Sequence, residues 1–177
     1  MLESHISWAV NNIGGSLKED ILEVLIYLFE NYMVDGVSFE SGQDELAREL
    51  IGAGFDGEEI DKAFVWLEGL MNIYQQDEAQ RFSVQTRQSI RFFTEQERQR
   101  LSLEAQSLLS RLVGVGVLDQ YSREMVIDRV MALDLVDVNL DHVRWVVLMV
   151  LSNQPEFYEI AEWAEVIISD ARLPVFH

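Results

Sequence analysis

Asp20–Met33 reads DILEVLIYLFENYM, and eight of these fourteen residues carry large apolar side chains. If the segment forms a helix, apolar groups surround it on almost every side, as is typical of a helix inside a core. The whole chain of 177 residues has only 10 Gly and 2 Pro, which favours long regular elements. We therefore predict a mostly α-helical, bundle-like protein built from helical hairpins, with at most one short β-hairpin near residues 81–93.

Capping residues and apolar spacing predict further helices after this segment. Thr94 and Glu97 have the spacing of a capping box, which begins a helix that we expect to continue to about Val113. The turn at Gly54-Phe55 between two predicted helices resembles that of ubiquitin-associated-type modules, although any packed helix pair gives the same pattern. The remaining predicted helices are Asp44–Ala53, Glu58–Met71, Ser122–Leu133, Leu140–Ser152 and Glu156–Ala171. Apolar periodicity alone does not distinguish a buried helix from a buried strand in Leu140–Ser152, but its acidic start and its length favour a helix.

The charge is strongly negative and unevenly placed. The formal net charge is -18, and residues 19–80 hold 16 Asp and Glu against 2 Lys and Arg. Such a field repels phosphate backbones, so direct nucleic-acid binding is disfavoured. We expect an extension or tag-like segment over residues 1–17, an acidic helical module over 18–73, a loop or hairpin linker over 74–93, and a second helical module over 94–177 packed on the first.

The sequence contains no recognisable catalytic or metal-binding motif. The absence of cysteine excludes disulfides and thiolate metal ligands. Asp137-x-Asn139-x-Asp141 resembles the start of a calcium loop, but His142 stands where that loop needs Gly, and Leu148 stands where it needs Glu. We interpret this segment as a helix-capping turn, and His142 as a hydrogen-bonded or solvent-facing helix histidine. We therefore expect no catalytic residue, no metal and no cofactor.

An arginine-rich island interrupts the acidic chain between residues 81 and 100. Its basic and aromatic members are Arg81, Phe82, Arg87, Arg91, Phe92, Phe93, Arg98 and Arg100. Such a mixture can bind single-stranded nucleic acid through phosphate pairing and base stacking. The arginines can also pair with the acidic N-terminal half of the same protein and reduce its self-repulsion. We favour the second interpretation, because the overall charge repels nucleic acid.

Six blocks of the sequence carry a family resemblance. They are Glu19–Tyr32, Ala53–Phe55, Ala63–Glu68, Ile90–Glu97, Arg123–Asp134 and Leu140–Leu151. They resemble the bacterial Smg family, in order and with few gaps from Lys18 to the end. The resemblance implies a domain of unknown function, and no catalytic residue carries over from it. Within the last block, Arg144 interrupts an apolar run, and we expect Asp128 or Asp134 to pair with it.

The leading functional prediction is a non-enzymatic cytoplasmic adaptor that binds another protein through a helical surface. It rests on the acidic helical body, the missing catalytic set and four aromatic residues, Trp66, Tyr74, Phe92 and Phe93. The candidate interaction residues are Arg81, Arg87, Arg91, Phe92, Phe93, Glu58, Glu59 and Asp61. No secretory signal is recognised, and the longest apolar run, Trp145–Leu151, is too short to cross a membrane.

The alternative prediction is a nucleic-acid-linked accessory protein. It would act either as an acidic mimic of a phosphate backbone or as a weak binder of single strands through the island Arg81–Arg100. A mimic needs a continuous strip of carboxylates. The candidates for such a strip are Glu45, Glu49, Glu58, Glu59 and Asp61.

Overall fold

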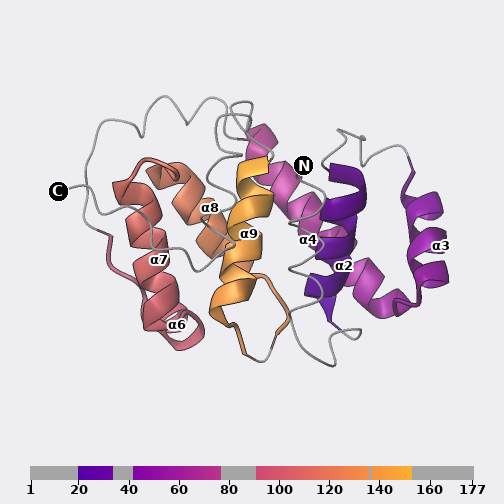
Figure 1. Ribbon diagram of the computed structural model, residues 1–177, viewed down its shortest axis with the longest axis horizontal. Helices are drawn as coiled ribbons and strands as arrows, with labels where there is room; N and C mark the ends of the chain where they lie inside the picture. The colour runs from indigo at the N-terminus through magenta and orange to yellow at the C-terminus, as the bar shows by residue number, and fades with distance from the viewer. Residues whose placement is uncertain (1–19, 34–41, 77–90, 136, 153–177) are drawn as a thin grey trace. The chain divides into compact units, whose positions relative to one another are not determined.

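The computed structural model describes residues 20–33, 42–76, 91–135 and 137–152 (Figure 1). Every regular element within these ranges is a helix, which confirms the prediction of a mostly α-helical protein. The chain divides into two compact units, residues 1–67 and 68–177. Of the predicted hairpin near residues 81–93, only 91–93 are described, and they form no strand. The predicted module boundaries and linker stay predictions.

Helix α2 (Ile21–Leu28) forms the apolar centre of the first unit. The Asp20 side chain caps its first turn by accepting a hydrogen bond from the Leu22 N–H, with 3.4 Å between donor and acceptor. The chain continues as a short π-helix, η1 (Phe29–Met33). All Ile, Leu, Val and Phe side chains from Ile21 to Phe29 are buried, so burial extends around the helix as the sequence predicts.

Helices α3 (Gln43–Ala53) and α4 (Gly57–Gln76) form the predicted hairpin. Gly54 ends α3 in the left-handed conformation, with a φ of 99°, which glycine adopts without steric cost. The Phe55 ring then meets Tyr27 of α2 edge to face, with 5.4 Å between the ring centroids. The turn is therefore closed by an aromatic contact with the central helix. Helix α4 begins in the first unit and ends in the second.

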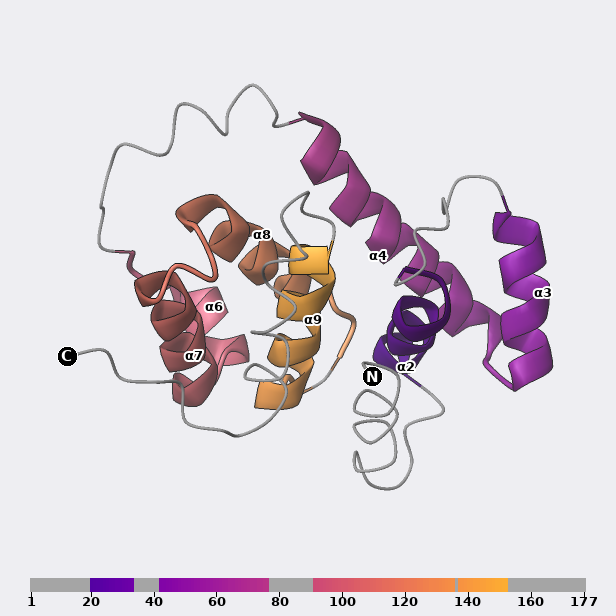
Figure 2. The same ribbon diagram turned by 45° about the horizontal axis from the view of Figure 1, so that its top comes forward.

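Helix α9 (Leu140–Ser152) is the buried centre of the second unit. Val143 and every residue of Trp145–Leu151 are buried, and the element has the bounds that the sequence predicts. Helix α8 (Gln120–Met131) packs along α9, and the two lie side by side in Figures 1 and 2. This unit is therefore also built around one helix that is apolar on nearly all sides.

The segment predicted as one helix from Thr94 to Val113 forms two helices instead. These are α6 (Glu95–Arg100) and α7 (Leu103–Gly114). Between them, the side chain of Leu101 turns into the core, and Ser102 caps α7 by accepting from the Ala105 N–H at 3.2 Å. The prediction is wrong here because apolar spacing does not show that the chain bends to bury Leu101.

Some predictions fall outside the described residues, namely the segment 1–17, most of the linker and the last helix, 156–171. Within the described ranges, none of the helices combines the length and hydrophobicity that a transmembrane span requires.

Candidate functional site

Arg91 is the centre of a cluster of charged and aromatic side chains in the second unit. Its Nη2 donates to Glu97 Oε1 at 2.7 Å, and its Nη1 donates to Glu97 Oε2 at 3.0 Å. Its Nε lies 2.7 Å from Glu124 Oε1 on α8. The guanidinium also lies over the Phe93 ring, 4.8 Å from the centroid. We call these four residues the Arg91 cluster.

The cluster lowers the pKa of Glu97 and is anchored by a helix cap. The Arg91 guanidinium lowers the pKa of Glu97 from 4.5 to about 2, while partial burial opposes the shift. The two carboxylates in turn raise the pKa of Arg91. Glu97 Oε2 also accepts from the Thr94 N–H at 2.8 Å, and Thr94 Oγ1 accepts from the Glu97 N–H at 3.3 Å. The predicted capping box is therefore confirmed, and its Glu97 also binds Arg91.

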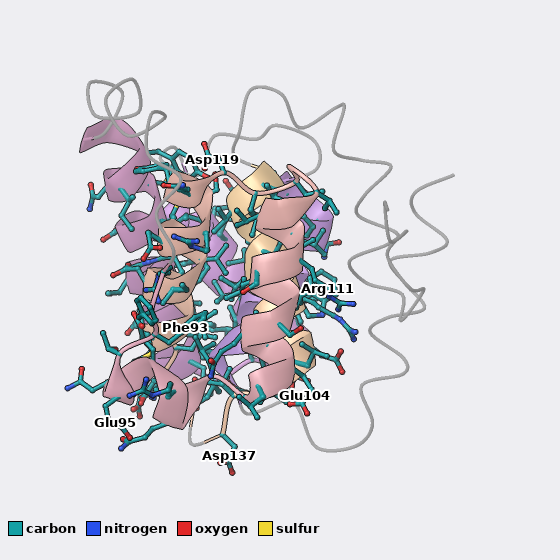
Figure 3. All side chains as sticks on the ribbon, turned by 90° about the vertical axis from the view of Figure 1, so that its left-hand side faces the viewer. Phe93, Glu95, Glu104, Arg111, Asp119 and Asp137 are labelled. Carbon is teal, nitrogen blue, oxygen red and sulfur yellow. The ribbon has the colours of Figure 1, made fainter. Side chains whose placement is uncertain are left out.

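Phe92 projects into solvent between two anchored neighbours. Phe92 as a whole residue is 83% exposed, whereas the side chain of Arg91 is only 16% exposed. In Figure 3, Phe93 lies close to the helices of its own unit, whereas the Glu95 side chain points away from them. Leu103, at the start of α7, is the other large apolar side chain of this unit that is exposed in the described ranges.

The other described arginines of the island are also engaged within the second unit. Arg98 Nη2 lies 2.7 Å from Glu95 Oε2. Arg100 Nη2 donates to Leu133 O at 2.7 Å and to Leu135 O at 3.1 Å, after the end of α8. The sequence interpretation placed the partners in the acidic N-terminal half, but the groups bound by Arg91, Arg98 and Arg100 follow residue 90. Two further members of the island, Arg81 and Arg87, lie outside the described residues.

The three predicted acidic residues lie together on the first turns of α4, in the first unit. Lys62 Nζ is 2.9 Å from Glu59 Oε1 and 3.3 Å from Glu58 Oε1. These two carboxylates raise the pKa of Lys62. Asp61 is exposed on the same helix. Lys62 therefore offsets part of the charge that a phosphate mimic would present.

A different carboxylate of the proposed strip is engaged by a tyrosine. Glu49 on α3 accepts a hydrogen bond from the Tyr32 hydroxyl, which raises the pKa of Tyr32 to about 12. Because Glu49, Glu58 and Glu59 all have partners within the unit, three of the five carboxylates of the strip are occupied.

The structure also changes which aromatic and apolar residues are available to a partner. Trp66 is buried, and Tyr74 is half-buried and donates its hydroxyl to the Val150 carbonyl. Trp66 therefore cannot form an exposed surface, and Tyr74 presents only part of its side chain. Sequence reasoning missed Val65 and Ile51, which are exposed on α4 and α3. In the sequence, Val65 lies four residues after Asp61 and seven after Glu58, a spacing that places it on the same side of α4 as these two acids.

The Asp137–Asp141 segment behaves as a helix cap. Asn139 Oδ1 accepts from the His142 N–H at 2.9 Å, and His142 Nδ1 accepts from the Asn139 N–H at 3.3 Å. The imidazole is thus buried and hydrogen-bonded in the cap. Asp141 Oδ1 accepts from Arg144 Nη1 at 2.7 Å, a partner that the sequence analysis did not name. In the part of the chain that the structure describes, no three His, Asp or Glu residues are grouped as a metal site.

Comparisons with known proteins connect the chain to bacterial relatives. The sequence matches the family model described as protein of unknown function (DUF494) over residues 21–177. The Smg homologue of Nitrosococcus oceani is 47% identical over 161 residues, which are 91% of this chain and 100% of the relative. The homologue of Thioalkalivibrio sulfidiphilus is 40% identical over the same shares. No solved structure matches the chain.

Proposed function

We propose that this chain, which belongs to the Smg family of proteins of unknown function (DUF494), is a cytoplasmic adaptor that binds another protein through Phe92. Its role would be binding and not catalysis. The observation that supports it is an exposed Phe92 on a segment that the Arg91 cluster anchors.

Because Phe92 is exposed, a partner that covers its side chain gains the free energy of burying it. Covering a Phe side chain stabilises a complex by about 2 kcal/mol or more. Single exposed apolar residues are common on protein surfaces, so exposure alone does not indicate a site. Here, however, both neighbours are anchored, since Arg91 binds two carboxylates and covers the ring of Phe93. A partner can therefore bury Phe92 without first ordering the segment, which is the advantage of a preorganised anchor.

The charges near Phe92 indicate what kind of partner pocket would fit it. Arg91 is paired with Glu97 and Glu124, and Arg123 is also paired with Glu124. Arg98 is paired with Glu95, so three guanidinium groups face three carboxylates. Because these charges are matched within the unit, the surroundings of Phe92 are close to neutral. We infer that the partner offers an apolar pocket with an uncharged polar rim. Such a complex should survive salt concentrations that screen surface charges.

Affinity purification from the native host tests the proposal. The tagged full-length chain is recovered at moderate salt, and bound proteins are identified and quantified by mass spectrometry. We expect one stoichiometric partner with the wild-type chain and at least about tenfold less of it with Phe92→Ala. Arg91→Lys should give an intermediate loss, because a lysine cannot hold two carboxylates in the forked geometry of a guanidinium.

Leu103→Ala is the matched control for this experiment. Leu103 is 78% exposed in the same unit, but it lies outside the Arg91 cluster. The partner should therefore be recovered with this variant at the wild-type level. Recovery of no stoichiometric partner, or an equal loss with Leu103→Ala, would contradict the proposal. Circular dichroism of each variant confirms that the helices are intact.

A nucleic-acid-linked role is the alternative proposal. The described contacts support it less, because Arg91, Arg98 and Arg100 already bind carboxylates or carbonyls of their own unit. Binding to a labelled single strand that is lost on Arg91→Lys and on raising the salt would favour this alternative over the adaptor role.

A further inference from the structure

We propose a second binding surface, on α4, which takes a basic amphipathic helix of a partner protein. It consists of Glu58, Asp61 and Val65, which are all exposed. Their spacing of three and four residues places them on one side of α4, along about 10 Å of its axis. We call this set the α4 face. It belongs to the first unit, and the proposal does not depend on Phe92.

Val65 is the apolar member of the α4 face. Its side chain is 69% exposed, whereas Ala63 and Trp66 on the core side of the same helix are buried. A β-branched residue at an exposed helix position is no better a helix former than most polar residues, so helix formation does not account for it. An apolar side chain of a partner would cover Val65 and recover its burial energy.

The carboxylates determine the sign of the partner's charge. Glu58 is only partly offset by Lys62, at 3.3 Å, and its side chain is 78% exposed. Asp61 is exposed one turn further along. The surrounding sequence strengthens their field, because residues 19–80 hold 16 Asp and Glu against 2 Lys and Arg. A partner that places Lys or Arg on either side of an apolar residue complements this face.

Charge also excludes the other classes of occupant. A nucleic acid or an anionic lipid surface would be repelled by the acidic unit. A second copy of the chain carries the same net charge of -18 and would be repelled as well. A helix is the fitting form for the partner segment, because its side chains repeat at the same three- and four-residue spacing as those of the α4 face.

Fluorescence anisotropy with the full-length chain tests the inference. The probe is a labelled peptide of Lys, Leu and Ala, about 18 residues long, with Lys and Leu on one helical face. A second probe has the same composition scrambled so that no such face exists. We expect the amphipathic probe to bind about tenfold more tightly than the scrambled one. Val65→Ser should weaken its binding about fivefold.

Charge variants separate a specific surface from general attraction. The double variant Glu58→Gln, Asp61→Asn should weaken binding about fivefold and reduce its salt dependence. The matched controls are Leu103→Ser for Val65→Ser, and Glu104→Gln with Asp137→Asn for the charge pair. Glu104 and Asp137 project from the second unit in Figure 3. Each control should change the affinity by less than about twofold.

Two results would overturn the α4 face as a site. One is equal affinity for the scrambled probe, and the other is an equal loss of affinity in the controls, since both indicate nonspecific attraction to an acidic protein. Phe92→Ala should leave peptide binding unchanged, so failure of this inference and failure of the adaptor proposal are distinguishable. Circular dichroism verifies that each variant retains its helices.

Discussion

Glu97 shows at the level of one residue how a local motif is used a second time by the tertiary structure. The sequence predicts that it completes a capping box with Thr94, and both hydrogen bonds are present. The same carboxylate also binds Arg91, six residues earlier, and Arg91 reaches Glu124 on α8. Spacing cannot predict these last contacts, because they depend on how the segment before α6 lies against another helix.

The lowered pKa of Glu97 gives a pH prediction. The value of about 2 lies below the usual 4.5, so the ionised form stabilises the folded state above about pH 4.5, and this stabilisation is lost as the pH falls towards 2. Glu97→Gln removes it at every pH. We expect wild type to exceed Glu97→Gln in free energy of unfolding by about 1 kcal/mol at neutral pH, allowing for solvent screening, with a difference that shrinks below pH 4.5.

Urea denaturation at a series of pH values measures this difference. Asp137→Asn serves as the control, since it removes an exposed carboxylate outside the Arg91 cluster. The free energy of unfolding of this variant should stay close to that of wild type throughout the same pH range. If the difference in free energy of unfolding between wild type and Glu97→Gln stays constant down to pH 2, the ion pair does not stabilise the folded state.

At the level of elements, several predicted helix ends agree with the structure and others do not. Helix α8 begins and ends two residues before the predicted Ser122–Leu133, because Asp119 caps it by accepting from the Ser122 N–H. Helix α3 ends at the predicted Ala53, α9 has the predicted bounds Leu140–Ser152, and the predicted capping turn precedes it. Helix α4 runs to Gln76, beyond the predicted end at Met71. The missed break between α6 and α7 has a different cause, because burial of Leu101 outweighs the continuation of a regular helix.

Two glycines at the C-terminal end of α3, Gly52 inside the helix and Gly54 at its cap, should respond in opposite directions to alanine. Gly54 has a φ of 99°, which strains any residue with a Cβ, so Gly54→Ala should lower the free energy of unfolding by about 1 kcal/mol. Gly52 lies within the helix with open space around an added Cβ, so Gly52→Ala should raise it by about 0.5–1 kcal/mol. Urea denaturation followed by circular dichroism measures both, and effects of the same sign would contradict the assigned cap.

For the molecule as a whole, net charge is the property that most affects stability and binding. The charge of -18 disfavours the compact state through self-repulsion, which ion pairs such as those of Arg91 and Lys62 reduce only locally. The two proposed binding surfaces also differ in their local charge. The surroundings of Phe92 are close to neutral, whereas the α4 face lies in the acidic part of the chain.

Salt should therefore stabilise the folded protein. On raising sodium chloride from about 0.05 M to about 0.5 M, we expect the free energy of unfolding to increase by about 1 kcal/mol, because screening weakens the repulsion among carboxylates. Urea denaturation at each salt concentration measures the change. A decrease would instead show that the screened ion pairs contribute more to stability than the repulsion removes.

The sequence by itself determined the helical class and the main helices, because apolar periodicity and capping residues act over three or four positions. It also determined the acidic character and the family. Only the tertiary structure decided that Trp66 is buried and that the Tyr74 hydroxyl donates to Val150. It also decided that Phe92 and Val65 are exposed, and that Arg91 binds Glu97 and Glu124. The physical reason is that exposure and long-range pairing depend on which faces of separate helices meet, and spacing along one helix carries no information about its neighbour.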